Sequence, residues 1–410
     1  MAIGDIDIQS FTIGSMNILD PATVALVGFN IYEDILNPYG PMGEARLYDY
    51  NDTLGKNSVN GKEDVTIKFG IPTGKQTLTY NFKLFQNKNL SDQSTEEKGS
   101  MHSKRYDYHF ISPEMLNAQG NYVGHSFNTL TSDMVKQILE NNFKTTHSIQ
   151  VDSPTVGQRR LVFHNEHPLR VIQKLNLEHV SSKNKSSCYT VYKTQSSGNQ
   201  VYKITEFEEL FKQSPVVTLN QTAGLAVSSS DQDKQNSIMW FNGGDSFQTS
   251  TRAFSKSNPI IYNPSIGEIH NRPPAAPIKY YVAGQPVYAT PRKEDTAVPT
   301  VQNGDSVNNK IKTGTADAKA NRLDFLSHLS QNSMELEVPG NPLITLGSMV
   351  NLNIPKKANQ DNGSGETQLN GPALVVSIRH KVKPLGQVPR YTMILRVVKA
   401  GFNQGGGGNG

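Results

Sequence analysis

The sequence predicts a mainly β fold of the α+β class: two tandem small antiparallel β-barrels with an α/β insertion and extra helices. Three observations support this prediction. Apolar and polar residues alternate in short segments near both ends of the 410-residue chain, which is typical of half-buried strands. Helical spacing of apolar residues occurs only between and beside these segments. Asn, Gln, Ser and Thr supply most of the polarity, and they suit hairpins and loops better than long helices.

The first 111 residues show a run of strand patterns without a helix pattern. Turn formers precede two of the strands, namely Asn-Pro-Tyr-Gly-Pro from residue 37 and the Asn60–Gly61 pair. Such a run favours an antiparallel meander that hides its edges by closing into a barrel. We assign 1–111, together with about 185–245, to the first barrel domain. Its early strands are predicted at 24–32, 44–50, 65–69, 78–84 and 105–112.

Residues 112–184 change period and are predicted to form an α/β insertion. Thr131 is expected to cap a helix that carries apolar residues from Met134 to Leu139 on one face. A short strand at 160–163 follows. Pro168 is expected in the first turn of a second helix. A hairpin of 189–193 and 201–204 is expected to return the chain to the first barrel.

The second half is predicted to contain an irregular part and a second barrel. Residues 246–314 are rich in Pro, Ser and Asn, and we assign them to an irregular connection and part of the second barrel. Residues 315–402 are predicted to hold a helix near 315–330 and the second barrel, and 403–410 a flexible glycine-rich tail. A mobile hairpin tip is expected at 356–371. The strands are predicted at 334–338, 343–354, 374–380 and 391–398.

Composition excludes several classes of protein. The formal net charge is +4 and there is one cysteine, Cys188, so neither a nucleic-acid surface nor a disulfide framework is indicated. The N-terminus has no signal-peptide pattern, and no apolar run approaches the length of a membrane span. We expect a soluble protein without membrane binding, assembled in or released from a cytoplasm.

A search for catalytic and ligand-binding patterns predicts no catalytic, cofactor-binding or metal-binding residue. The stretch from Gly70 to Lys75 fails the phosphate-loop pattern, and His164 with His167 lacks the zincin order and a third ligand. The acidic stretches 231–233 and 359–366 do not match a calcium loop. Cys188 is expected to be a small packing residue. We therefore expect a binding or structural protein rather than an enzyme.

Several segments resemble the baseplate hub protein of contractile-tailed (myovirus) bacteriophages, which is also the N-terminal part of the type VI secretion spike protein VgrG. Their order and spacing carry the resemblance, and 335–350 is the segment most similar to the family. The residues of these segments with structural roles are Glu33, Gly43, Glu44, Gly61, Ser112, Glu114, Pro168, Gly340, Asn341, Gly347, His380 and Tyr391. The segments are 29–36, 43–49, 61–69, 108–114, 163–172, 335–350, 373–380 and 391–395.

The resemblance implies a ring-shaped homotrimer in which two barrels per chain make six. Such a ring would join a threefold central spike to a sixfold tail tube in the virion baseplate. The implied partners are further copies of the chain, the central spike, the tail tube, the tape-measure protein and the wedge proteins. DNA would only pass through the axial channel. The C-terminal region from about 385 would face the spike.

Two other functions stay open on sequence alone. Another β-rich tail component, such as a distal tail or wedge protein, would show barrels without needing two similar ones. A cell-wall hydrolase attached to the tail would need a cleft with perturbed acids or a metal.

Overall fold

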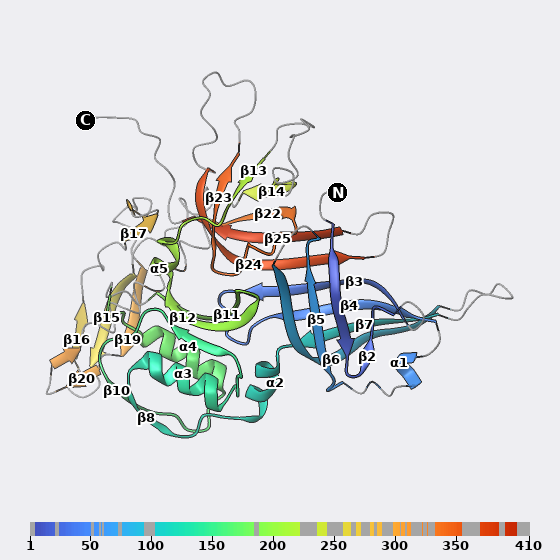
Figure 1. Cartoon of the computed structure of the whole chain (residues 1–410). Helices are drawn as coiled ribbons and strands as arrows, with labels where there is room; N and C mark the ends of the chain where they lie inside the picture. Colours follow the sequence, from blue (N-terminus) through green and yellow to red (C-terminus); the bar gives the residue numbers. More distant parts are fainter. Residues whose placement is uncertain are drawn as a thin grey trace, which may run out of the picture.

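The computed structural model is mainly β and antiparallel, as predicted (Figure 1). The structure describes residues 5–20, 24–50, 53–56, 59, 61–72, 76–93, 103–183, 188–221, 236–243, 257–263, 268–271, 279–282, 285–288, 298–303, 305–307, 310–312, 322, 326, 333–354, 370–384 and 390–399. The predicted tip at 356–371, apart from its last two residues, and the tail at 403–410 lie outside these residues. Only two residues of the predicted helix at 315–330 are described.

The first module is a curved antiparallel sheet with the strand order β3-β4-β7-β6-β5-β1-β2. Each strand alternates buried and outward residues, which follows from the period of two in the sequence. The rings of Phe11 on β1 and Phe29 on β3 meet edge to face at 5.7 Å, so the two ends of the sheet share one core. The elements are β1 (Asp7–Ile13), β2 (Met16–Asn17), β3 (Val24–Asp34), β4 (Met42–Asp49), α1 (Thr53–Lys56), β5 (Asp64–Gly70), β6 (Thr77–Gln93) and β7 (Ser103–Ile111).

The second module contains strands from the last part of the chain and two short strands from its middle. Its order is β14-β22-β25-β24, with β23 pairing β24 and β13 pairing β23. Residues 185–245 are predicted to belong to the first barrel, but β13 and β14 within them pair with β23 and β22 of the second module. The sequence of a four-residue strand gives no indication of its partner. The strands are β13 (Val217–Asn220), β14 (Trp240–Gly243), β22 (Ser333–Pro339), β23 (Met349–Asn353), β24 (Gly371–Lys383) and β25 (Arg390–Val398).

The two modules are joined by direct strand pairing. Ser377–Val382 on β24 pairs antiparallel with Asp34–Phe29 on β3, so the modules share one 13-stranded sheet. Figure 1 shows β24 and β25 lying along β3 and β4. One hydrophobic core accordingly contains residues of both modules, such as Phe29 and Leu47 from the first and Leu336 and Leu395 from the second. Burial of this shared apolar surface stabilises the junction.

The α/β insertion follows β7 and has its own core. Helices α3 and α4 bury Met134, Ile138, Val171 and Ile172 against each other and against the following hairpin. Thr131 is the first helical residue of α3 and Leu130 is its N-cap, so the predicted cap is wrong by one residue. The elements are α2 (Pro113–Gly120), β8 (Ser126–Thr129), α3 (Thr131–Asn141), β9 (Ser148–Val151), β10 (Arg159–Val162) and α4 (Pro168–Glu178).

The hairpin of β11 (Tyr189–Ser196) and β12 (Asn199–Glu206) lies between the two cores, with α5 (Phe207–Phe211) after it. Ser197 and Gly198 have φ values of 51° and 81°, which a tight hairpin turn requires. Tyr189 and Tyr202 face the insertion core, whereas Tyr192 faces the shared core of the modules. β12 also pairs in parallel with β9. The hairpin therefore attaches the insertion to both modules.

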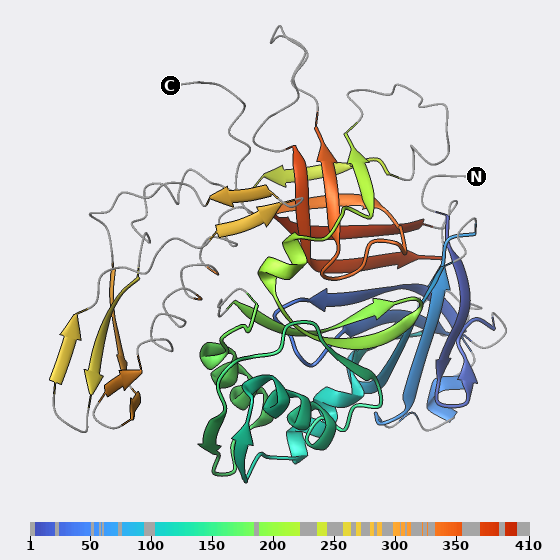
Figure 2. The same cartoon turned by 60° about the vertical axis from the view of Figure 1, so that its left-hand side comes forward.

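Seven further strands form small separate sheets in the segment 257–312. β15 pairs β16 and β19, β17 pairs β18, and β20 pairs β21. Figure 2 shows β15, β16 and β19 at the side of the molecule away from the first module. The strands are β15 (Ser257–Asn263), β16 (Glu268–Asn271), β17 (Lys279–Val282), β18 (Gln285–Tyr288), β19 (Val298–Asn303), β20 (Asp305–Val307) and β21 (Lys310–Lys312).

One predicted strand is shorter than expected. The apolar pattern at 343–354 predicts a single strand, but β23 begins only at Met349. Residues 340–348 form turns, in which the amide of Ile344 donates to the carbonyl of Asn341 at 3.0 Å and that of Ser348 to Thr345 at 3.0 Å. Gly347 has a φ of 82°, which belongs to the last of these turns and which glycine adopts without strain.

Candidate functional site

A buried polar group crosses the junction between the modules, and we call Glu33, Tyr80, His380 and Tyr391 the seam cluster. His380 Nδ1 lies 2.8 Å from the Tyr391 hydroxyl, and Nε2 lies 3.1 Å from the Tyr80 hydroxyl and 3.3 Å from Glu33 Oε2. These residues come from β3, β6, β24 and β25, so one imidazole connects strands of both modules.

Strand alternation and aromatic packing produce the seam cluster. Each member occupies an inward position of its strand, and Phe69 packs edge to face against both His380 and Tyr391. Burial, followed by the charge of Glu33, raises the pKa of Tyr80 and Tyr391 well above 10, so both phenols keep their protons. His380 and Glu33 are 1% and 4% exposed. A substrate in solvent does not reach them, which favours a structural role.

Gly340 makes room for the ring of Tyr391. A Cβ at this position would overlap that ring, and the Gly340 amide donates to the Tyr391 carbonyl at 2.8 Å. Asn341 follows in the turn, where its Oδ1 accepts from the Leu343 amide at 3.0 Å. The turn and β25 are therefore held together through a contact that only glycine permits.

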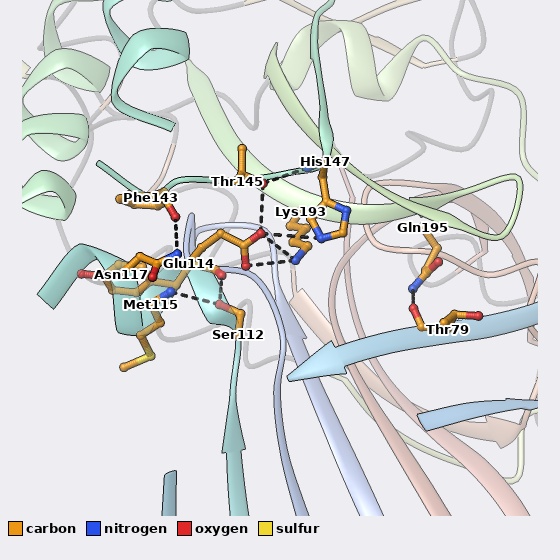
Figure 3. Close-up of polar contacts among 11 residues, drawn as sticks. Thr79, Ser112, Glu114, Met115, Asn117, Phe143, Thr145, His147, Lys193 and Gln195 are labelled. Atoms are coloured by element: carbon orange, nitrogen blue, oxygen red, sulfur yellow. Dashed lines mark hydrogen bonds and ion pairs between the residues drawn. The ribbon is translucent and has the colours of Figure 1, made fainter. Parts of the chain in front are cut away.

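A second buried group connects the insertion to the hairpin, and we call Glu114, Thr145, His147 and Lys193 the bridge cluster. Figure 3 shows the Glu114 carboxylate between the other three side chains. Lys193 Nζ lies 3.1 Å from both carboxylate oxygens, the Thr145 hydroxyl donates at 3.0 Å, and His147 Nε2 lies 3.6 Å away. The cluster thus connects α2, the loop after α3 and β11.

Burial controls the charges of the bridge cluster. The side chains of Lys193 and Glu114 are 0% and 3% exposed. Burial lowers the pKa of Lys193, while the Glu114 carboxylate opposes that change. Burial and then the Lys193 charge lower the pKa of His147, so the imidazole is neutral at pH 7 and the carboxylate pairs with the ammonium. A buried ion pair of this kind fixes one arrangement of its elements at a cost in desolvation.

Other residues of the predicted set lie outside the two clusters, at helix starts and in turns. The Ser112 hydroxyl donates to the Tyr39 carbonyl and accepts from the Met115 amide at 3.3 Å, as the N-cap of α2. Pro168 occupies the first turn of α4. Gly61 has a φ of 83° in the turn before β5. At Gly347 a Cβ would overlap the hydroxyl of Tyr192.

The structure brings only some predicted residues together. Glu33, His380 and Tyr391 meet in the seam cluster, with Gly340 beside them, while Ser112 and Glu114 meet at the start of α2. Four members of the two clusters are absent from the predicted set, namely Tyr80, Thr145, His147 and Lys193. Lys193 carries one signal, because it is the single charged residue of β11.

The outward face of the shared sheet is hollowed. A groove of about 410 Å³ lies over β14, β22, β24 and β25, and one of about 710 Å³ lies over β3, β4, β7 and β24. Both grooves are lined by Arg379, whose guanidinium carbon lies 5.2 Å from the centre of the Tyr32 ring. Gly43 and Glu44 of the predicted set lie on β4; Glu44 lines the larger groove, and Gly43 faces Phe110.

Among the described residues, no group of His, Cys, Asp and Glu has the arrangement of a metal site. His164 is exposed, Cys188 is buried, and the acidic stretches 231–233 and 359–366 lie outside the described residues. No helix in the described part of the chain is long and apolar enough to cross a membrane.

Comparisons with known proteins identify the fold. No family model and no curated protein matches the sequence. A tail protein of Neisseria meningitidis matches with a TM-score of 0.58 and 10% identity, over 97% of this chain and 98% of its own. The 43 kDa tail protein of prophage MuSo2 from Shewanella oneidensis matches with a TM-score of 0.54 and 11% identity, over 96% and 98%.

A component of the Escherichia coli type VI secretion system, described as similar to the T4 phage tail proteins gp27 and gp5, also matches. Its TM-score is 0.50 at 10% identity, over 95% of this chain and 76% of that one. The resemblance inferred from the sequence is therefore confirmed as a likeness of fold that extends over nearly the whole chain.

Proposed function

We propose that this chain is the baseplate hub of a contractile phage tail. In this proposal three copies close into a ring of nearly sixfold symmetry, which joins the central spike to the tail tube and encloses the channel for the tape-measure protein and DNA. The barrel of 1–111 with part of 185–245, and the barrel of 315–402, would occupy alternate positions in the ring. The location would be the virion baseplate.

One observation carries the proposal: a single chain holds two β modules that share one continuous sheet. A threefold assembly presents six similar surfaces only if each subunit carries two, and a rigid connection must keep their spacing. The β3–β24 pairing and the seam cluster supply that connection. The likeness to tail proteins over their full length supports the same function.

The proposed partners follow from this position. The type VI component with the same fold is described as similar to tail proteins gp27 and gp5, which supports contacts with a central spike. The tail tube, the tape-measure protein and the wedge proteins would contact the other surfaces of the ring. The role would be structural rather than enzymatic, because both buried clusters are closed to substrate and act between elements of the fold.

The test is the native mass of the purified chain over a concentration series, alone and with the spike protein. One chain is 45.2 kDa, and we expect a species of about 136 kDa, since closed threefold symmetry requires three copies. Class averages from electron microscopy should show a ring with six similar lobes. A monomer in the presence of the spike would contradict the hub proposal and favour a distal tail or wedge component.

A further inference from the structure

Strand β24 presents a row of cations on the outward face of the shared sheet. Arg379, Lys381 and Lys383 occupy alternate positions, and all three line the larger groove. Residues at i, i+2 and i+4 of a strand project from one face at intervals of about 6.8 Å. The row therefore has the repeat of an extended polypeptide whose alternate side chains point the same way.

The sheet neutralises this row only in part. Lys383 is directly opposite the exposed Arg390 of β25, and like charges in opposite positions destabilise a sheet. Lys383 makes no ion pair with another described residue, and the contact of Lys381 Nζ with Glu337 is long, at 3.8 Å. The like charges of Lys383 and Arg390 therefore repel each other, and an anion bound between them would relieve this repulsion.

The two acidic residues of the groove already have partners. Asp107 is paired with Arg46 at 2.9 Å and with Arg105 at 2.7 Å. Glu44 accepts hydrogen bonds from Asn30 at 2.7 Å and from Tyr32 at 2.6 Å. Against these two carboxylates the groove carries the cations Arg46, Arg379, Lys381 and Lys383, so an excess of positive charge remains along β24.

Arg379 has capacity for a further ligand. Its Nε is buried and has no hydrogen-bond partner within the described part of the chain, although such nitrogens are normally satisfied. The guanidinium is held in place over Tyr32 and lies where the two grooves meet. A planar, positioned guanidinium is suited to a carboxylate, which it binds through two parallel hydrogen bonds.

We propose that the larger groove binds an extended, acidic segment of another protein, with alternate Asp or Glu side chains on Arg379, Lys381 and Lys383. The charge excess, the strand-like repeat and the positioned guanidinium of Arg379 in the groove lining carry the inference. A nucleic acid is less well matched, because the aromatic residues that line the groove, Phe29 and Tyr108, are buried and offer no surface for base stacking.

This inference goes beyond the hub proposal and holds for the chain whether or not it closes into a ring. The test is fluorescence anisotropy of the full chain with a labelled ten-residue peptide of alternating Glu and Thr. We expect saturable binding that weakens as salt is added, since exposed charges are screened. A peptide of the same composition, with its Glu residues in one block, should bind more weakly because it loses the repeat.

The variant Arg379→Gln/Lys381→Gln/Lys383→Gln should weaken binding by about tenfold, as three charge contacts near the surface are lost. The double variant Lys381→Gln/Lys383→Gln retains the stacked Arg379 and should give an intermediate loss of affinity. It serves as the test if the triple variant folds poorly. The control Lys68→Gln/Lys136→Gln removes two charges from outside the groove, on β5 and α3, and should change affinity less than about twofold.

Each other result overturns the proposal. Absence of saturable binding, or equal binding by the triple variant and the control variant, would show that the groove is not the site. Tighter binding of a ten-nucleotide oligothymidine than of the alternating peptide would assign the row to nucleic acid. Self-association that disappears in the triple variant, without peptide binding, would assign it to a second copy of the chain.

Discussion

The seam cluster and the bridge cluster are both buried, but they satisfy their polar atoms differently. The seam cluster places one imidazole between two phenol hydroxyls and a carboxylate. The bridge cluster depends on an ion pair between Lys193 and Glu114. Loss of a phenol hydroxyl leaves an unsatisfied nitrogen in the first case, whereas loss of Glu114 leaves a buried charge in the second, which costs more. The attachment of the insertion should therefore be more sensitive to substitution than the junction of the modules.

The largest expected effect is in the bridge cluster. Glu114→Ala should lower the free energy of unfolding by about 3–5 kcal/mol, because Lys193 is left charged and unpaired in the interior. Chemical denaturation followed by circular dichroism measures the change.

The double variant Glu114→Gln/Lys193→Met separates charge from packing. It should recover most of the loss, since no buried charge remains. Lys136→Ala, which removes an exposed pair with Glu140 at 3.9 Å, is the matched control and should have little effect. If the double variant is as unstable as Glu114→Ala, the ion pair does not explain the sensitivity of this region.

Gly340→Ala tests the seam from its edge. The added methyl group overlaps the ring of Tyr391, and overpacking of this kind costs about 2–3 kcal/mol. Gly120→Ala is the control, because no atom lies within 4 Å of the added carbon. Thermal denaturation should show a lower Tm for the first variant alone, and equal Tm values would contradict the packing argument.

Acid should loosen the insertion. Burial lowers the pKa of His179 from 6.5 to about 3, so between these values the unfolded chain binds a proton that the folded chain does not. Stability contributed by this group is present above pH 6.5 and is lost as pH falls towards 3, by about 2 kcal/mol at pH 5. Unfolding measured at pH 8 and pH 5 should show a smaller difference in His179→Gln, and an unchanged difference would assign the acid sensitivity elsewhere.

The smallest effect is expected at the seam hydroxyls. Tyr391→Phe removes one hydrogen bond to His380 and leaves its Nδ1 unsatisfied, at a cost of about 1–2 kcal/mol. Tyr122→Phe, at a 49% exposed ring, is the control and should change stability little. A loss at Tyr391 as large as that of Glu114→Ala would remove the distinction between the two clusters.

The sequence predicts the elements of this protein better than their partners. Alternation predicts the strands that carry Glu33, His380 and Tyr391, and Pro168 predicts the start of α4. Alternation does not indicate the partners of β13 and β14, because four residues with little alternation are compatible with any sheet edge. The strand predicted at 343–354 is too long for a different reason. An apolar run does not show where a turn, such as the one at the left-handed Gly347, replaces extended backbone.

By itself the sequence determined the class of the fold, the two β modules and the helical insertion, because apolar periodicity and turn residues act locally. Only the tertiary structure decided that β3 pairs with β24, that Tyr80 meets His380 across 300 residues of sequence, and that Lys193 is buried against Glu114. Those contacts depend on which outward and inward faces meet when the chain closes, and a strand pattern specifies its faces but not the strand that covers them.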